Sequence, residues 1–407
     1  MNKKPELLVP ASSLEVLKTA IIFGADAIYI GGQAFGLRAK AKNFTIDDIK
    51  KGVEFAHQYD KKVYITANII AHNDDLESVR EYFGELKSIN PDGLIIADPA
   101  IFEIAKEVLP KIEIHISTQA NNTNYGTYNF WWKLGAKRVV SARELSLDEI
   151  CEIRKNIPDE MEIESFMHGA MCMSYSGRCL LSNYFTGRDA NRGACTHPCR
   201  WKYSVVEETR PGEYMPIYEN ERGTYIFNSK DLCMIEHIPE MINAGIDSFK
   251  IEGRMKTALY VATVARTYRK AIDDYLEDPQ KYQDNMPWYL DQISNCTYRQ
   301  FTTGFYFGKP DETTQIYDSN TYIREYTYLG IVLEVKDGKY KIEQKNKFSV
   351  GEEIEIMKPN GQNISTKVIS ISDVDGNEME SAPHPQQILW IKTENMANEF
   401  DILRKQE

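Results

Sequence analysis

Residues 62–97 read KVYITANIIAHNDDLESVREYFGELKSINPDGLIIA, and this stretch decides the fold. It begins and ends with short apolar runs, and between them lies a helical stretch with apolar residues on one side. A strand, a helix and a second strand of these lengths form a parallel βα unit. The sequence on both sides of this stretch continues the same alternation.

Eight apolar runs of this kind lie between Glu6 and Asp278. Each run is almost continuously apolar, as expected for strands that are buried on both faces. Eight parallel strands with helices between them predict an α/β fold, a closed (β/α)8 barrel of the TIM type. The expected strands are Glu6–Val9, Ala27–Ile30, Lys62–Asn68, Gly93–Ala97, Glu113–Ser117, Arg138–Ser141, Glu162–Met167 and Ser248–Ile251.

One connection interrupts this alternation of short strands and helices. About eighty residues separate Met167 from Ser248, far more than the usual link between a barrel strand and its helix. Five of the seven cysteines lie in this insertion. Active sites of such barrels are built from loops at the C-terminal ends of the strands, and the insertion leaves the seventh strand at that end. We therefore expect the insertion to carry function.

The pattern changes again near residue 322. From there on apolar and polar residues alternate with a period of two, and Asn-Gly and Asp-Gly pairs mark tight turns. This pattern predicts a small β-barrel of the oligonucleotide-binding or translation-factor kind. The expected organisation is the βα barrel at 1–278 with the cysteine-rich insertion at 168–246, a linker packed on the barrel at 279–321, and the β-barrel at 322–407.

Composition limits the classes of function. The net charge of −12 disfavours indiscriminate nucleic-acid binding, because phosphate contacts depend on Lys and Arg, so any such site must be local. No apolar run approaches the ~20 residues of a membrane span, and the chain starts without a signal-like segment, so we expect a cytoplasmic protein. The cytosol keeps thiols reduced, and seven cysteines there indicate metal or redox chemistry rather than disulfides.

The cysteines of the insertion are candidate metal ligands. Four thiolates can hold either a Zn²⁺ ion or an iron–sulfur cluster, and their spacing does not choose between the two. Buried, inert thiols are the alternative. We interpret Cys151 and Cys296, outside the insertion, as structural. The cysteines of the insertion are Cys172, Cys179, Cys195, Cys199 and Cys233.

One long pattern runs from the seventh strand into the insertion. Its positions are Glu164, Phe166, Gly169, Ala170, Met171, Cys172, Gly177, Cys179, Leu181 and Ser182. This pattern resembles the signature of the U32 (collagenase-like) peptidase family, and Glu6–Ala11 and Lys250–Arg254 also look like features of that family. The resemblance implies a 4Fe–4S cluster on Cys172, Cys179, Cys195 and Cys233, with Cys199 as the alternative to Cys195. Zinc stays the alternative metal.

Within that family the chain is most similar to the branch that hydroxylates the wobble uridine of tRNA to 5-hydroxyuridine. The resemblance implies an oxygen-independent reaction in which prephenate takes part, tRNA as the partner, and a second family member as a further candidate partner. The family name refers to proteolysis, which is the second hypothesis, although the sequence contains neither a His-Glu-x-x-His helix nor a Gly-x-Ser-x-Gly elbow. A non-catalytic RNA-binding or assembly protein is the third.

Polar residues near the strand ends are candidates for the chemistry. We expect His168 to point into the barrel mouth and transfer protons, or else to orient the loop by a hydrogen bond. Glu252 and Arg254 are expected to act in catalysis, with Arg254 holding a carboxylate or phosphate, unless they form a barrel-closing salt bridge. The remaining expected substrate-binding residues are Asn68, Arg143 and Lys250, with Asp98 and Gln119 at neighbouring strand ends.

The insertion also carries a local excess of positive charge. Aromatic residues such as Trp201 lie between the cations and could stack on bases, so the segment suits tRNA. A solvated surface with a few structural aromatics is the alternative. The candidate RNA-binding residues are Arg178, Arg188, Arg192, Arg200 and Lys202.

Overall fold

The structure is a computed structural model, and it describes residues 3–32, 43–171, 181–188, 195–196, 219–220, 223–224, 230–296, 300–308 and 325–407. Several predicted site residues lie outside these ranges: Cys172, Gly177, Arg178, Cys179, Arg192, Cys199, Arg200 and Lys202.

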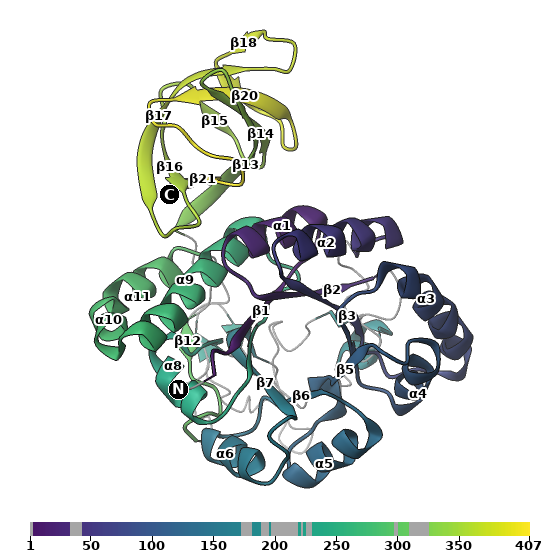
Figure 1. The fold of residues 1–407 in the computed structure, drawn as a ribbon. Coiled ribbons are helices and arrows are strands. Elements are labelled where there is room, and N and C mark those ends of the chain that lie inside the picture. Colours follow the sequence, from purple (N-terminus) through teal and green to yellow (C-terminus); the bar gives the residue numbers. More distant parts are fainter. Residues whose placement is uncertain are drawn as a thin grey trace, which may run out of the picture.

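Eight parallel strands form the predicted closed barrel (Figure 1). Neighbouring strands pair in chain order, and the last one closes the ring by pairing with both the first and the seventh. The strands are β1 (Glu6–Pro10), β2 (Ala27–Gly31), β3 (Lys62–Ala67), β4 (Gly93–Ile96), β5 (Glu113–Ile116), β6 (Arg138–Val140), β7 (Glu162–Ala170) and β11 (Ser248–Ile251).

Helices surround the barrel, as Figure 1 shows along its axis. Their apolar faces pack on the outward side chains of the strands and form one continuous core. The outer helices are α1 (Leu14–Ile22), α2 (Ile46–Gln58), α3 (Leu76–Ile89), α4 (Pro99–Val108), α5 (Tyr125–Leu134), α6 (Leu147–Lys155), α8 (Ile238–Asn243) and α9 (Ala258–Glu277).

The seventh strand is longer than predicted. β7 continues past Met167 to Ala170, and its end pairs antiparallel with β10 (Asp231–Cys233). β12 (Phe301–Thr302) then adds to β10. The end of the insertion is therefore fixed to the barrel sheet. Before β10 the insertion contains the described elements α7 (Leu181–Thr186) and the paired strands β8 (Glu219–Asn220) and β9 (Gly223–Thr224), and after β10 it continues into α8.

The segment expected to be a linker contains two helices, α10 (Pro279–Asp284) and α11 (Met286–Ser294), which pack against α9. Asp278 caps α10 through the backbone N–H of Gln280, and Pro279 occupies its first turn. This segment is thus an extension of the barrel's outer layer.

The C-terminal domain is an antiparallel six-stranded barrel, closed by the pairing of β16 with β17. It lies beside α1 and α9 in Figure 1. Arg266 of α9 donates to the carbonyl oxygen of Lys358 at 2.8 Å, which ties the two domains together. The strands are β13 (Tyr326–Lys336), β14 (Lys339–Gln344), β15 (Phe348–Ser349), β16 (Glu353–Met357), β17 (Asn363–Ser372), β18 (Glu378–Met379), β19 (Ser381–Ala382), β20 (Ile388–Thr393) and β21 (Ile402–Gln406).

Within the described ranges, no helix combines the length and the apolar composition that crossing a bilayer requires.

Candidate functional site

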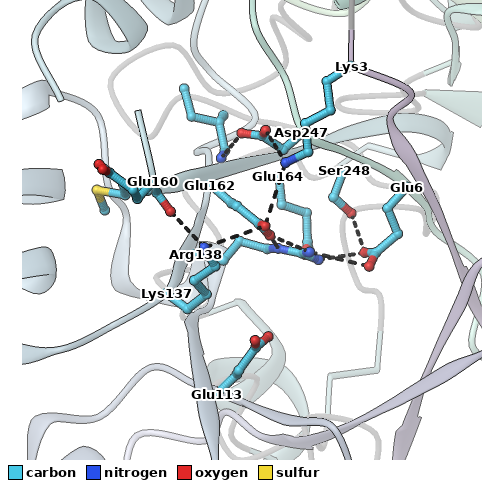
Figure 2. Close-up of polar contacts among 12 residues, drawn as sticks. Lys3, Glu6, Glu113, Lys137, Arg138, Glu160, Glu162, Glu164, Asp247 and Ser248 are labelled. Carbon is cyan, nitrogen blue, oxygen red and sulfur yellow. Dashed lines mark hydrogen bonds and ion pairs between the residues drawn. The ribbon is translucent and has the colours of Figure 1, made fainter. Parts of the chain in front are cut away.

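The N-terminal end of the barrel is closed by charge pairs around Arg138 (Figure 2). The guanidinium group, 3% exposed, lies 2.6 Å from carboxylate oxygens of both Glu6 and Glu162 and 3.2 Å from Glu164. Burial alone would raise the pKa of Glu6, but Arg138 outweighs it and brings that pKa to about 2. The buried guanidinium group of Arg138 is thus surrounded by carboxylate partners, so this end serves stability.

A second ion pair fills the middle of the barrel. Lys250 Nζ donates to Glu164 Oε1 at 2.6 Å, and both side chains are buried. The ammonium group also lies 4.4 Å from the ring centroid of Tyr29. Lys250, which the sequence suggested as a substrate-binding residue, is therefore paired with Glu164, and the pair forms the floor of the C-terminal mouth.

Two arginines line the C-terminal mouth. The guanidinium group of Arg143, just after β6, lies 3.9 Å from the ring centroid of Phe166 and 3.7 Å from Glu252 Oε2. Arg254, 7% exposed, donates to Thr66 Oγ1 at 2.7 Å. Glycine at position 31 makes room for it, because a Cβ there would lie 2.7 Å from Arg254 Nη1. The two guanidinium groups make this part of the mouth suited to an anion.

Amide groups also line the mouth, just after β3 and β5. Asn68 Nδ2 donates to Ser117 Oγ at 3.2 Å, and the backbone N–H of Gln119 donates to the same oxygen at 3.3 Å. Asn68 Oδ1 and Gln119 Oε1 are buried and have no hydrogen-bond partner among the residues that the structure describes. A buried acceptor without a partner destabilises a protein by about 1–3 kcal/mol, so a ligand that supplies N–H or O–H groups here would relieve this penalty.

The structure places His168 elsewhere than expected. Its ring lies against Tyr260 and Tyr268 of α9 and against Phe301, with centroid distances of 6.1, 5.6 and 5.6 Å, on the outer side of the sheet. The cause is a register shift between β7 and β11, where Lys250 pairs with Phe166 but Ile251 pairs with His168.

The environment of His168 also argues against proton transfer in the mouth. Burial, with Lys256 nearby, lowers the pKa of His168 to about 3, so the ring is neutral at pH 7. Its Nδ1 lies 3.4 Å from the hydroxyl of Tyr268. These contacts favour the alternative role, in which His168 orients the strand end that leads to the cysteines.

The signature residues have structural reasons for their identity. Glu164 pairs with Arg138 and Lys250, as described, and Phe166 lies beneath Arg143. Gly169 adopts φ +109°, and a Cβ there would lie 2.5 Å from the carbonyl oxygen of Glu252. Ser182 Oγ accepts the backbone N–H of Thr196 at 3.0 Å, which fixes the residue next to Cys195. Together they hold the mouth and the insertion in place.

Of the proposed metal ligands, Cys195 and Cys233 lie in the described ranges. Cys233 belongs to β10 and pairs in register with His168, while Cys172 follows the last residue of β7 by two positions. The β7–β10 pairing therefore brings the two cysteine-bearing segments together, and thiol ligands suit a soft metal site. The described residues include no group of three metal-binding side chains, since Cys172, Cys179 and Cys199 lie outside them. Burial raises the pKa of the Cys233 thiol to about 11.

A cleft of about 1240 Å³ lies between the C-terminal rim of the barrel and the C-terminal domain. Its wall includes Lys256 and Lys345, but Lys345 is paired with Glu15 and Glu343 at 2.8 Å each. The described charges of its wall are nearly balanced, and they do not supply the positive excess expected of a strong RNA groove. Of the predicted basic residues, Arg188 is described and exposed.

The sequence pattern missed several residues that complete the site. Thr66 holds Arg254, Ser117 joins Asn68 to Gln119, and Tyr268 contacts both His168 and Cys233. Thr66 and Ser117 fall at strand ends, where a search for polar residues could have found them. Tyr268 lies within a long helix and carries no signal of its own.

Fold and site define a two-domain βα-barrel protein whose C-terminal mouth is lined with arginines and amides and bordered by a cysteine-bearing insertion. The chain belongs to peptidase family U32. Residues 12–316 match Peptidase family U32, and residues 324–404 match the Peptidase family U32 C-terminal domain.

Similar curated proteins include two that are named for tRNA hydroxylation. The chain is 43% identical to tRNA hydroxylation protein P1 of Bacillus subtilis over 407 residues, 100% of this chain and 96% of that protein. It is 37% identical to tRNA hydroxylation protein P of Escherichia coli, over 95% of this chain and 93% of that protein. It is also 38% identical to the 23S rRNA 5-hydroxycytidine C2501 synthase of Escherichia coli, over 67% of this chain and 40% of that protein.

Proposed function

We propose that this chain is an RNA-modifying protein of the U32 family that takes part in the oxygen-independent hydroxylation of a tRNA wobble uridine to 5-hydroxyuridine. The observation that carries the proposal is the C-terminal mouth, where Arg143 and Arg254 occur together with side-chain oxygens of Asn68 and Gln119 that have no partner among the described residues. The similarity to tRNA hydroxylation proteins over nearly the whole chain supports it.

The mouth would hold the small-molecule reactant. Prephenate carries two carboxylates, a hydroxyl group and a carbonyl group, so it presents both acceptors and a donor. Arg143 and Arg254 would bind the carboxylates through charge-assisted hydrogen bonds. The hydroxyl group would donate to Asn68 Oδ1 or Gln119 Oε1. The Lys250–Glu164 pair beneath is already satisfied, and so would form a fixed floor rather than a ligand.

The proposed cofactor is a 4Fe–4S cluster held by Cys172, Cys179, Cys195 and Cys233, with Cys199 as the alternative to Cys195 and zinc as the alternative metal. When bound, such a cluster supplies one-electron transfer. The contribution of the chain is to fix the ligand-bearing segments: the β7–β10 pairing fixes Cys233, and Ser182 holds the backbone beside Cys195.

The RNA would approach the same face in the cytoplasm. The balanced charge of the interdomain cleft leaves the insertion as the better source of phosphate contacts, through Arg188 together with Arg178, Arg192, Arg200 and Lys202. A second member of the family remains a candidate partner subunit.

Two measurements test the proposal. Mass spectrometry of tRNA nucleosides from a deletion strain should show no 5-hydroxyuridine, and the wild-type gene should restore it while Arg254→Lys should not, because lysine cannot reproduce the planar guanidinium fork. Protein purified without oxygen should contain about four irons and four acid-labile sulfides per chain. Unchanged 5-hydroxyuridine in the deletion strain would reject the tRNA reaction.

The purified protein also tests the two other hypotheses, proteolysis and a non-catalytic binding role. Proteolysis needs an activated nucleophile, and His168 faces α9 rather than the mouth. Cleavage of unfolded peptides by pure protein, lost in Cys199→Ala, would move proteolysis to first place. A Cys233→Ala variant that loses the metal and still supports full RNA hydroxylation would indicate that the metal only stabilises the fold of the insertion.

A further inference from the structure

Tyr268 of α9 connects the two strands at which the cysteine insertion begins and ends. Its hydroxyl oxygen lies 3.0 Å from the carbonyl oxygen of Met167 in β7 and 3.1 Å from the backbone nitrogen of Met234, just after β10. It also lies 3.7 Å from Cys233 Sγ. The side chain has 0% exposure, so water does not compete for these contacts.

The Tyr268 hydroxyl has one hydrogen, which limits the hydrogen bonds that it can donate. A tyrosine hydroxyl donates one hydrogen bond and accepts two. The N–H of Met234 donates to it, and the hydroxyl hydrogen can go to the carbonyl of Met167, to His168 Nδ1 at 3.4 Å or to Cys233 Sγ. A thiol can donate to the tyrosine oxygen, but a metal-bound thiolate can only accept. Coordination of Cys233 would therefore favour donation from Tyr268 to the sulfur.

We propose that Tyr268 is a positioning residue for the cysteine-ligated cluster: its hydroxyl fixes Cys233 between β7 and β10 and donates a hydrogen bond to the coordinated sulfur. This inference rests on the proposed function, because it requires the cluster. Hydrogen bonds to ligand sulfurs raise the reduction potential of such clusters, since they stabilise the more negative reduced state.

Tyr268→Phe tests this inference with Tyr282→Phe as a matched control. Tyr282 is equally buried, and its hydroxyl donates at 2.7 Å to the carbonyl of Ile235, two residues beyond Cys233. Both variants therefore lose hydroxyl hydrogen bonds near the same segment, and Tyr268→Phe also leaves the N–H of Met234 without its acceptor. Protein is purified without oxygen, and iron, acid-labile sulfide, melting temperature and midpoint potential are measured for each variant.

The expected result is a more negative midpoint potential in Tyr268→Phe alone. One lost hydrogen bond should change the ratio of oxidised to reduced cluster about tenfold at a fixed ambient potential, which is about 59 mV for a one-electron couple. Selective loss of iron from Tyr268→Phe, with a melting temperature equal to that of Tyr282→Phe, would support the positioning role as well. Equal potentials and iron contents in wild type and Tyr268→Phe would overturn the inference and leave the proposed function intact.

A measurement on unmodified protein covers the case in which Tyr268→Phe does not fold. The iron–sulfur stretching bands of the wild-type cluster should shift between H₂O and D₂O when a ligand sulfur accepts a hydrogen bond. Bands that do not shift would overturn the inference without any variant. Wild-type protein that contains no iron–sulfur cluster would overturn both the inference and the cluster part of the proposed function.

Discussion

Arginine side chains have different surroundings at the two ends of the barrel. At the N-terminal end Arg138 has three glutamate partners within 3.2 Å. At the C-terminal mouth Arg143 lies 3.7 Å from Glu252 and Arg254 donates to Thr66, and among the described residues the side-chain oxygens of Asn68 and Gln119 have no partner. Arginine therefore meets a cluster of carboxylates at the end that stabilises the fold, and lies beside unpaired amide acceptors at the mouth, where we propose that a ligand binds. Four changes test this contrast, from the largest expected effect to the smallest.

Arg138→Met should produce the largest loss of stability. It leaves Glu6, Glu162 and Glu164 buried without their shared cation, and breaking a buried pair in this way lowers the free energy of unfolding by about 3–5 kcal/mol. Denaturant unfolding at pH 7 measures the change. Arg80→Met, which breaks an exposed pair with Glu107, is the control and should unfold like wild type. Equal stability of the two variants would contradict a structural role for the N-terminal end.

Arg254→Lys should have the reverse effect, with little change in unfolding and a loss of function. Loss of the guanidinium fork should reduce 5-hydroxyuridine in tRNA by about 10²-fold, the effect typical of removing one aligned donor. Complementation of a deletion strain followed by nucleoside mass spectrometry gives the result. Arg269→Lys, a substitution on α9 at an ion pair with Asp26, should retain full modification. Full modification by Arg254→Lys would remove this arginine from the proposed ligand site.

Asn68→Leu tests whether the amide oxygen of Asn68 binds a ligand. The change removes a buried oxygen that has no partner, together with the bond to Ser117, so the two effects oppose each other and stability should change by less than about 1 kcal/mol. Loss of one ligand hydrogen bond should lower modification about tenfold. A variant that is more stable and fully active would show that Asn68 Oδ1 does not meet a ligand.

The smallest effect concerns pH at the N-terminal half of the barrel. Burial, with Arg138 nearby, lowers the pKa of His115, so the folded protein binds a proton on this ring less readily than the unfolded chain does below about pH 6.5. The free energy of unfolding should therefore fall as pH drops from 7 to 5.5. His115→Phe keeps a ring against Tyr64 and should make this fall smaller, while His168, whose pKa is also lowered, supplies its own part. A wild-type slope in this variant would assign the effect to other groups.

Most of the fold can be predicted from short-range patterns. The eight barrel strands appear as apolar runs, and the C-terminal barrel appears as period-two alternation with tight turns. The short strands β10 and β12 did not stand out, because two or three residues carry no periodicity and pair only through tertiary context. The helices α10 and α11 could have been found, since Asp278-Pro279 is a helix-start signal.

The site was less predictable than the fold. Arg143 and Asn68 lie at the predicted mouth, because the end of a barrel strand fixes the position of the residues directly after it. The orientation of His168 depends on a register shift between β7 and β11, which no local pattern shows. Arg138 contacts Glu6, which lies 132 positions away in the sequence. A contact over that separation depends on the closed barrel, and no local sequence pattern indicates it.

The order in which the barrel closes has a consequence for synthesis on the ribosome. β11, which joins β7 to β1, comes after the whole cysteine insertion in the chain. The nascent sheet therefore keeps two open edges, at β1 and β7, while every cysteine of the insertion emerges. Whatever loads these thiols can meet them before the ring closes, and a pause in translation within the insertion would prolong the stage most exposed to mispairing and aggregation.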